Sequence, residues 1–205
     1  MAWRELMATV PVEDEGLVLE GVWQNGDRGA VVAPPHPLYG GSFDNPVVNE
    51  IAYALYRLGQ ASLRFNWRGV GASQGVATGD PGAAECDYRA ALDHVIATVG
   101  APVTAAGYSF GAATALRLAL CDERISDLVL VAPPIQLIKS LDLESFEGPI
   151  RVFVGAHDEI AQAAELAEFF SPRSDARVGV IESADHFFVH GGLAELSTLI
   201  QGRDP

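Results

Sequence analysis

Positive charge and long apolar segments are both scarce in this sequence. Of its 205 residues, 13 are Lys or Arg and 27 are Asp or Glu, so the net charge is −14, and Lys139 is the single lysine. Such a chain repels phosphate groups, which argues against nucleic-acid and anionic-membrane partners. No apolar run reaches the roughly 18 residues that a membrane-spanning helix needs. Residues 1–10 carry charges without an apolar stretch behind them, so we read no secretory signal and expect a cytoplasmic protein.

Cysteine is also scarce, which bears on disulfides, metals and nucleophiles. Cys86 and Cys121 both lie in segments expected to be helical, and their spacing is not that of metal ligands. We therefore predict two reduced, buried thiols in a reducing compartment, and no metal site. A cysteine nucleophile is the alternative, but neither residue follows a strand at a turn.

The chain does contain a regular alternation of apolar strands and helices, and we expect a single domain over residues 1–205 with a sizeable core. The first two strands read as an antiparallel pair joined at residues 14–16. The alternation that follows predicts a mostly parallel sheet of about eight strands with helices on both faces. The expected strands are 7–12, 17–24, 30–34, 62–66, 102–108, 128–132, 150–155 and 177–181, and the expected helices are 46–58, 81–99, 110–120, 160–170 and 193–200.

One motif at a strand-to-helix junction points to a nucleophile. Residues 107–111 read Gly-Tyr-Ser-Phe-Gly and lie between the strand 102–108 and the helix 110–120. A G-x-S-x-G sequence in this context places its serine on a sharp turn that lifts the Oγ clear of the sheet. Side chains at Gly107 and Gly111 would collide across that turn, and the helix N-terminus stabilises developing negative charge. We therefore predict that Ser109 is the nucleophile.

A second match to the same motif serves as an internal control. Residues 71–75 read Gly-Ala-Ser-Gln-Gly, but four residues separate them from the strand that ends at Asn66, and the segment that follows cannot form a helix. We predict an irregular loop over residues 68–79, in which Ser73 lacks the sharp turn that a nucleophile needs.

The serine requires a base, and histidine is suited because its ordinary pKa lies near working pH. His186 follows the strand 177–181 through the short loop 182–185, which places it over the carboxyl edge of the sheet. His190, one helical turn later, is the rival. The sequence has five histidines: His36, His94, His157, His186 and His190.

The base requires an acid that fixes its tautomer. Asp158 directly follows the strand 150–155, so it also lies at the carboxyl edge. Glu159 is the nearest rival, although an acid there suits the start of a helix. Asp185 adjoins His186, and neighbours in a loop rarely face each other. The order Ser109, Asp158, His186 along the chain is the order expected of this fold.

An oxyanion hole requires two backbone N–H donors. We expect Phe110, which follows the nucleophile, to supply one. The other should come from the loop of residues 34–41, where Pro37 has no N–H to give. We predict Leu38 as this donor, with Tyr39 as the second choice.

With these residues assembled, the chain resembles the α/β-hydrolase superfamily, and more narrowly small lidless bacterial serine esterases near the dienelactone-hydrolase and serine-aminopeptidase groups. The resemblance implies an acyl-enzyme, hydrolysis by water and no cofactor. Residues 133–149 leave no room for a lid. Dienelactone hydrolases use a cysteine nucleophile, so Ser109 favours ordinary esters. The matching segments are residues 36–41, 65–73, 107–111 and 185–188, together with Asp158.

The predicted function is hydrolysis of small carboxylic esters by a serine hydrolase whose partner is a small-molecule ester. Two alternatives stay open. The same residues also serve amide, peptide or thioester hydrolysis, and a slow-turnover ligand-binding or sensor protein can keep both fold and triad.

Overall fold

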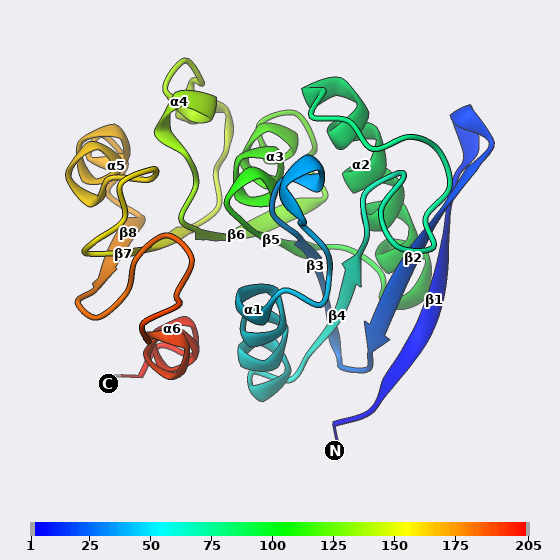
Figure 1. Cartoon of the computed structure of the whole chain (residues 1–205), viewed down its shortest axis with the longest axis horizontal. Coiled ribbons are helices and arrows are strands. Elements are labelled where there is room, and N and C mark those ends of the chain that lie inside the picture. The colour runs from blue at the N-terminus through cyan, green and yellow to red at the C-terminus, as the bar shows by residue number, and fades with distance from the viewer. Residues whose placement is uncertain (1–2, 204–205) are drawn as a thin grey trace.

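An eight-stranded sheet crosses the computed structural model, which describes residues 3–203 (Figure 1). Its strand order is β1-β2-β4-β3-β5-β6-β7-β8. The β1–β2 and β2–β4 pairs are antiparallel and the other neighbours are parallel, as the alternation of strands and helices predicted. The strands are β1 Glu5–Val12, β2 Leu17–Gln24, β3 Arg28–Ala33, β4 Gln60–Phe65, β5 Val103–Tyr108, β6 Ile125–Val131, β7 Ile150–Gly155 and β8 Ala176–Ile181.

Helices cover both faces of the sheet. Helices α1 and α6 lie on one face, and α2, α3 and α5 lie on the other (Figure 1). No helix among residues 3–203 is both long and apolar enough to cross a membrane. The helices are α1 Pro46–Arg57, α2 Pro81–Val99, α3 Phe110–Ala119, the single turn α4 Ile135–Ile138, α5 Ala163–Phe170 and α6 Leu193–Ile200.

Local sequence explains where the helices begin and end. The side chain of Asn45 accepts a hydrogen bond from the Val47 N–H at the start of α1, and Asp80 does the same for the Ala83 N–H at the start of α2. Both α1 and α2 have proline at their first position, where no backbone N–H is needed. Gly59, just beyond α1, has a left-handed φ of 80°. Both helices begin at the residues expected from the sequence, 46 and 81.

Helix α5 begins later than the sequence suggested. It starts at Ala163 and not at residue 160. The Asp158 carboxylate explains the difference, because its Oδ1 accepts hydrogen bonds from the Ile160 and Ala161 N–H groups. Those N–H groups form a turn around the carboxylate before the helix can start.

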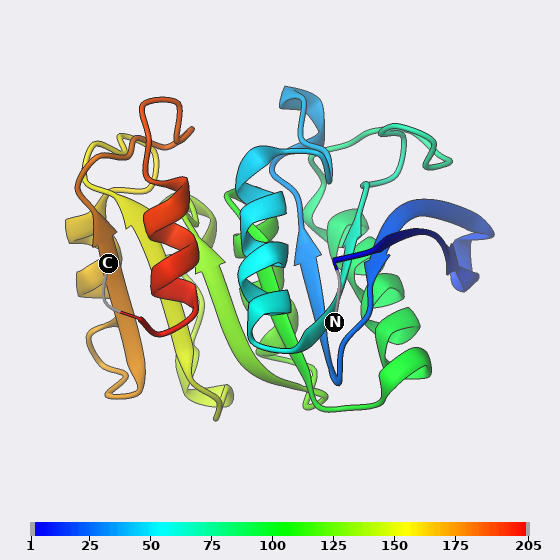
Figure 2. The ribbon, with the colours of Figure 1, turned by 90° about the horizontal axis from the view of Figure 1, so that it is seen from below.

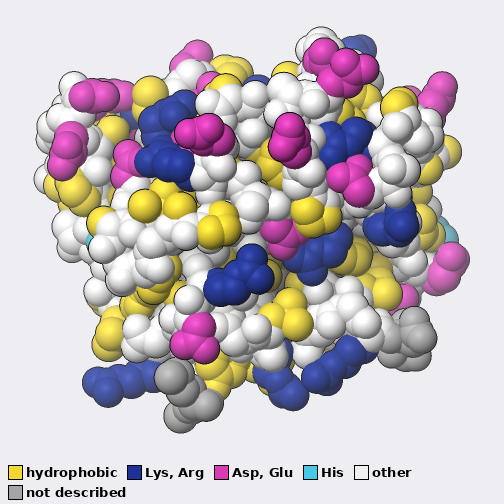
Figure 3. Space-filling model, turned by 180° about the vertical axis from the view of Figure 1, so that it is seen from behind, with side chains coloured by type: hydrophobic (Ala, Val, Ile, Leu, Met, Phe, Trp, Pro, Cys, Tyr) yellow, Lys and Arg dark blue, Asp and Glu magenta, His cyan; other side chains and the backbone are white. Residues whose placement is uncertain are grey.

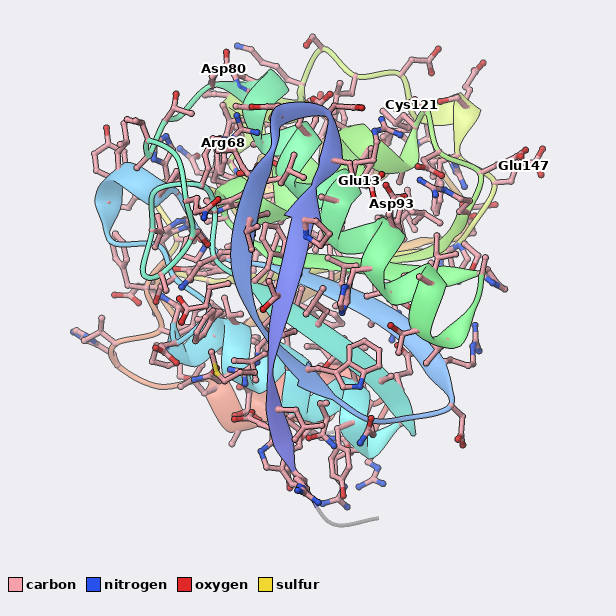
Figure 4. The ribbon with its side chains drawn as sticks, turned by 90° about the vertical axis from the view of Figure 1, so that its right-hand side faces the viewer. Glu13, Arg68, Asp80, Asp93, Cys121 and Glu147 are labelled. Carbon is pink, nitrogen blue, oxygen red and sulfur yellow. The ribbon has the colours of Figure 1, made fainter. Side chains whose placement is uncertain are left out.

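The prediction of buried cysteines was wrong. Cys86 and Cys121 are both free and exposed. Cys86 lies on the outer side of α2, whose inner side is formed by residues such as Ala84 and Tyr88. Cys121 follows the end of α3 at the surface, where Figure 4 labels it.

Nothing between β6 and β7 can cover the carboxyl edge of the sheet as a lid domain would. The segment holds α4 and one 3₁₀ turn, Leu143–Ser145. The expectation of a lidless fold is thus confirmed. Figure 2 shows the parallel strands pointing upward, with the loops that follow them projecting at the top.

Charged side chains of both signs are interspersed on the side opposite to the view of Figure 1 (Figure 3). Several arginines are held in ion pairs, including Arg117 with Glu85 and Arg151 with Asp127. Figure 3 shows no broad patch of a single charge sign on the described part of that face.

One buried ion pair fixes the irregular loop of residues 68–79 to α2. Arg68 donates from its backbone N–H, Nε and Nη2 to the Asp87 carboxylate, with Nη2···Oδ1 at 2.8 Å. Asp87 is almost fully buried, whereas Glu15, the second partner of Arg68, is partly exposed. Figure 4 shows Arg68 beside the amino end of α2.

We expect Asp87→Ala to lower the free energy of unfolding by about 3–5 kcal/mol, because it removes the buried partner of the Arg68 guanidinium and leaves only the partly exposed Glu15 carboxylate. Glu15→Ala is the matched control and should cost much less, since that carboxylate is solvated and its ion pair is screened by water. Urea unfolding monitored by circular dichroism measures both. Equal losses in the two variants would contradict the assignment of Asp87 as the anchor.

Candidate active site

Ser109 lies on a strained turn between β5 and α3. Its backbone has φ 54° and ψ −116°, which is unusual for a residue with a side chain. A Cβ at Gly107 would lie 2.5 Å from the Gly111 carbonyl carbon, and a Cβ at Gly111 would lie 2.5 Å from the carbonyl oxygens of Ala33 and Pro34. The structure thus confirms that a side chain at either flanking glycine would collide with the backbone. It also shows that the turn packs closely against the end of β3.

The structure brings the three predicted side chains together in one hydrogen-bonded chain. The Ser109 Oγ lies 3.1 Å from the His186 Nε2, and the His186 Nδ1 lies 2.8 Å from the Asp158 Oδ2. All three residues are buried. The carboxylate favours the tautomer with a proton on Nδ1, which leaves Nε2 free to accept the serine proton.

The Asp158 carboxylate is held on both of its oxygens. Its Oδ1 accepts the N–H groups of Ile160 and Ala161 at 2.8 and 2.7 Å, and its Oδ2 faces the His186 ring. The two backbone donors therefore fix which oxygen meets the imidazole.

The loop that carries His186 is tied to β5, the strand before Ser109, by a contact that the sequence did not predict. The Tyr108 hydroxyl donates to the His186 carbonyl oxygen at 2.6 Å. Burial raises the pKa of Tyr108, so this hydroxyl stays protonated and remains a donor. In the sequence, this contact is visible only as a tyrosine directly before Ser109, and that tyrosine gives no indication of a partner 78 positions away.

A close backbone approach brings the loop that carries His186 to the loop that carries Asp158. A Cβ at Gly155 would lie 2.3 Å from the Ala184 carbonyl oxygen, and the His157 N–H donates to that same oxygen at 3.0 Å. Glycine at the end of β7 therefore allows the loop of residues 182–192 to reach Asp158.

The rival residues have other surroundings. The Ser73 Oγ accepts from the Glu20 N–H and donates to the Asn66 carbonyl, so it braces an irregular loop, as predicted. His190 and Glu159 are exposed. The Asp185 carboxylate accepts backbone N–H groups within its own loop.

The expected oxyanion donors differ in their availability. Phe110 is the first residue of α3, and its N–H has no acceptor among the described residues. The Leu38 N–H donates to the His36 Nδ1 at 3.2 Å, and the Tyr39 N–H donates to the His36 carbonyl at 3.1 Å. Both N–H groups that the sequence suggested for the second donor are thus engaged within the loop.

Exposed apolar side chains lie on five loops at the carboxyl edge of the sheet, which is the edge where Ser109 lies. These loops follow β4, β3, β6, β7 and β8, which lie on either side of β5 in the sheet, and β5 ends directly before Ser109. Phe187 is 64% exposed, and its ring lies 5.2 Å from the His186 ring. We call this set the apolar rim: Leu38, Tyr39, Val76, Leu137, Ile160, Phe187 and Val189.

No group of three or more His, Cys, Asp or Glu side chains in the described part of the chain is arranged to hold a metal ion. The polar groups that converge at Ser109 are those of acyl transfer: a hydroxyl, an imidazole, a carboxylate and a helix N-terminus.

The comparisons with known proteins agree with the fold. A family model described as serine aminopeptidase, S33, matches residues 45–141. The structure is similar to an α/β serine hydrolase homologue from Coxiella burnetii, with a TM-score of 0.82, 30% sequence identity, and coverage of 98% of this chain and 97% of that one. It is also similar to an α/β serine hydrolase without a lid from Xanthomonas campestris, with a TM-score of 0.81, 29% identity, and coverage of 97% and 93%. An uncharacterized protein of Rickettsia prowazekii is 34% identical over an alignment of 174 residues, and the match covers 78% of this chain and 71% of that one.

Proposed function

The chain belongs to the α/β-hydrolase superfamily, and on that premise we propose that it is a serine hydrolase of small carboxylic esters. The observation that carries the proposal is the hydrogen-bonded chain from Asp158 through His186 to Ser109, on a strained turn at a helix N-terminus. Four features of serine acyl transfer thus coincide in one place: nucleophile, base, acid and a free N–H donor.

In the proposed reaction, the Ser109 Oγ attacks the ester carbonyl carbon while the His186 Nε2 takes the hydroxyl proton. Asp158 stabilises the resulting imidazolium, and backbone N–H groups stabilise the oxyanion. The tetrahedral intermediate collapses, the carbon–oxygen bond to the alcohol breaks, and His186 returns the proton to the leaving alcohol.

The second half repeats the chemistry with water. His186 removes a proton from a water molecule, whose oxygen attacks the acyl carbon of the acyl-Ser109 ester. Collapse releases the carboxylic acid, and the proton held by His186 restores the Ser109 hydroxyl. No oxidant, metal or other cofactor enters this balance.

A panel of nitrophenyl esters, thioesters and nitroanilides tests the proposal. We expect steady turnover of short esters that exceeds the turnover of matched amides. A burst of nitrophenol equal to the enzyme concentration, with no turnover after it, would instead indicate the slow-turnover sensor.

Amide or peptide hydrolysis is the second candidate, and the match to a family model named for a serine aminopeptidase supports it. The same triad performs it, with protonation of an amine leaving group as the added requirement. Aminoacyl nitroanilides turned over faster than nitrophenyl esters of equal acyl length would favour this candidate over the ester hydrolase.

We expect kcat/KM to be highest for short acyl chains of about two to six carbons, because a lidless site buries few methylenes and each buried CH₂ contributes about 0.8 kcal/mol. Four aromatic residues flank the site loops in sequence, and of these Phe43, Trp67 and Phe188 are buried while Phe187 alone is exposed. The apolar rim thus offers surface contact and not a long channel.

Nitrophenyl esters from acetate to palmitate measure this preference, with each ester kept below its solubility limit. Activity should show no jump when a substrate forms an oil–water interface, since no lid has to open. A steady climb in kcat/KM up to palmitate would show that the rim forms a groove and would overturn the expectation.

A further inference from the structure

We propose that the second oxyanion donor is the backbone N–H of His36, and that the His36 imidazole is the positioning group that holds the donor loop in place. The inference rests on the proposed function, because it assigns parts of the same site. It replaces Leu38, the donor that the sequence suggested.

The sequence of the loop leaves few donors to choose from. Residues 34, 35 and 37 are prolines, so His36 carries the only N–H between Ala33 and Leu38. That N–H has no acceptor among the described residues, whereas the N–H groups of Leu38, Tyr39 and Gly41 are all bonded to His36 itself. Among the N–H groups of this loop, the one at His36 is therefore available to bond a substrate oxygen.

The position of His36 also suits the role. The end of β3 is pressed against the nucleophile turn, since a Cβ at Gly111 would meet the carbonyl oxygens of Ala33 and Pro34. His36 lies two residues further on, and its ring centroid is 4.7 Å from that of Phe110. Phe110 provides the first expected donor, so the two free N–H groups belong to residues in direct contact.

The imidazole organises the turn that follows. Its Nδ1 accepts the Leu38 N–H, and its carbonyl oxygen accepts the N–H groups of Tyr39 and Gly41, both at 3.1 Å. An accepting Nδ1 requires the neutral ring with its proton on Nε2. Burial lowers the pKa of His36, which favours that neutral form.

Packing fixes the ring on three sides. Phe110 and Tyr39 each have ring centroids 4.7 Å from that of His36. On the third side a Cβ at Gly79 would lie 2.6 Å from the His36 Nε2, so a side chain at position 79 would require the ring to shift. The loop of residues 68–79, which Arg68 and Asp87 anchor to α2, thus packs against the His36 ring and supports the loop of residues 34–41.

Replacing a backbone amide with an ester deletes one N–H and leaves the side chain unchanged, which tests the donor directly. The protein is made by translation with a tRNA that carries the α-hydroxy analogue of histidine at position 36, or of leucine at position 38 as the matched control. We expect a loss of about 10²–10³ in kcat at position 36 and less than 10-fold at position 38, with KM little changed in both. The reverse order would return the role to Leu38, and small losses at both positions would overturn the assignment of His36.

The role of the imidazole is tested by substitutions that remove one of its functions at a time. His36→Asn keeps an oxygen that can accept the Leu38 N–H but loses the ring, and His36→Ala loses both. We expect His36→Ala to lower kcat, and the affinity for a boronic acid that mimics the tetrahedral intermediate, by the same factor of about 10–100, and His36→Asn to recover most of it. His157→Ala, at an exposed histidine, is the control and should match wild type.

Gly79→Ala displaces the ring without changing His36, so it should reproduce part of the loss in boronate affinity even if His36→Ala folds poorly. Unaltered boronate affinity in both His36→Ala and Gly79→Ala, with melting temperatures near wild type, would overturn the positioning role. A wild-type protein that hydrolyses no ester and binds no boronate would instead contradict the proposed function itself.

Discussion

Ser109→Ala is expected to lower kcat for ester hydrolysis by about 10⁴–10⁶, because the members of a catalytic triad act as a unit and the loss of the nucleophile removes the covalent route. The substitution deletes one buried oxygen that bonds only to the His186 ring, so the fold should persist. Initial rates with nitrophenyl acetate, together with melting temperatures, measure both effects.

A fluorophosphonate probe tests the same residue without mutation. The Ser109 Oγ should attack phosphorus and displace fluoride, and peptide mapping by mass spectrometry should find the adduct on Ser109 alone. Ser73→Ala is the matched control: its Oγ bridges Glu20 and Asn66, so kcat of the folded protein should stay close to wild type. An adduct on Ser73, or none at all, would contradict the assignment.

Local signals explain why so much of the fold was predictable. The caps at Asn45 and Asp80 and the glycine after α1 are encoded within a few residues of the helix ends that they define. The nucleophile turn is equally local, because Gly107 and Gly111 record close backbone approaches that no other residue permits. The apolar strands then imply a parallel sheet, whose carboxyl edge collects the functional side chains.

Some features that escaped prediction depend on distant partners, and others on side-chain contacts with the backbone two or three residues away. Tyr108 and His186, far apart in sequence, meet only because β5 and the loop after β8 reach the same edge. The start of α5 shifted because Asp158 captures two N–H groups while it also faces the histidine ring. Leu38 was a reasonable donor by its position in the loop, but no local pattern reveals that a histidine two residues earlier accepts its N–H.

His186→Ala is expected to cost nearly as much as Ser109→Ala, about 10⁴–10⁶ in kcat, since the serine proton then has no acceptor. The matched control is His190→Ala, which removes an exposed imidazole four residues later and should leave kcat unchanged. If His190→Ala is inactive and His186→Ala is active, the base has been assigned to the wrong histidine.

Asp158→Asn should lower kcat by about 10²–10⁴, and the geometry of this carboxylate gives the reason. Its Oδ1 accepts two backbone N–H groups, so an asparagine must keep its oxygen there and turn its NH₂ toward the His186 Nδ1. The amide then donates to Nδ1, which places the imidazole proton on Nε2, where it blocks acceptance of the serine proton. Glu159→Gln, at the adjacent exposed carboxylate, is the control and should retain wild-type kcat. A large loss in Glu159→Gln with an active Asp158→Asn would transfer the role of the acid to Glu159, and full activity in both would remove the carboxylate from the mechanism.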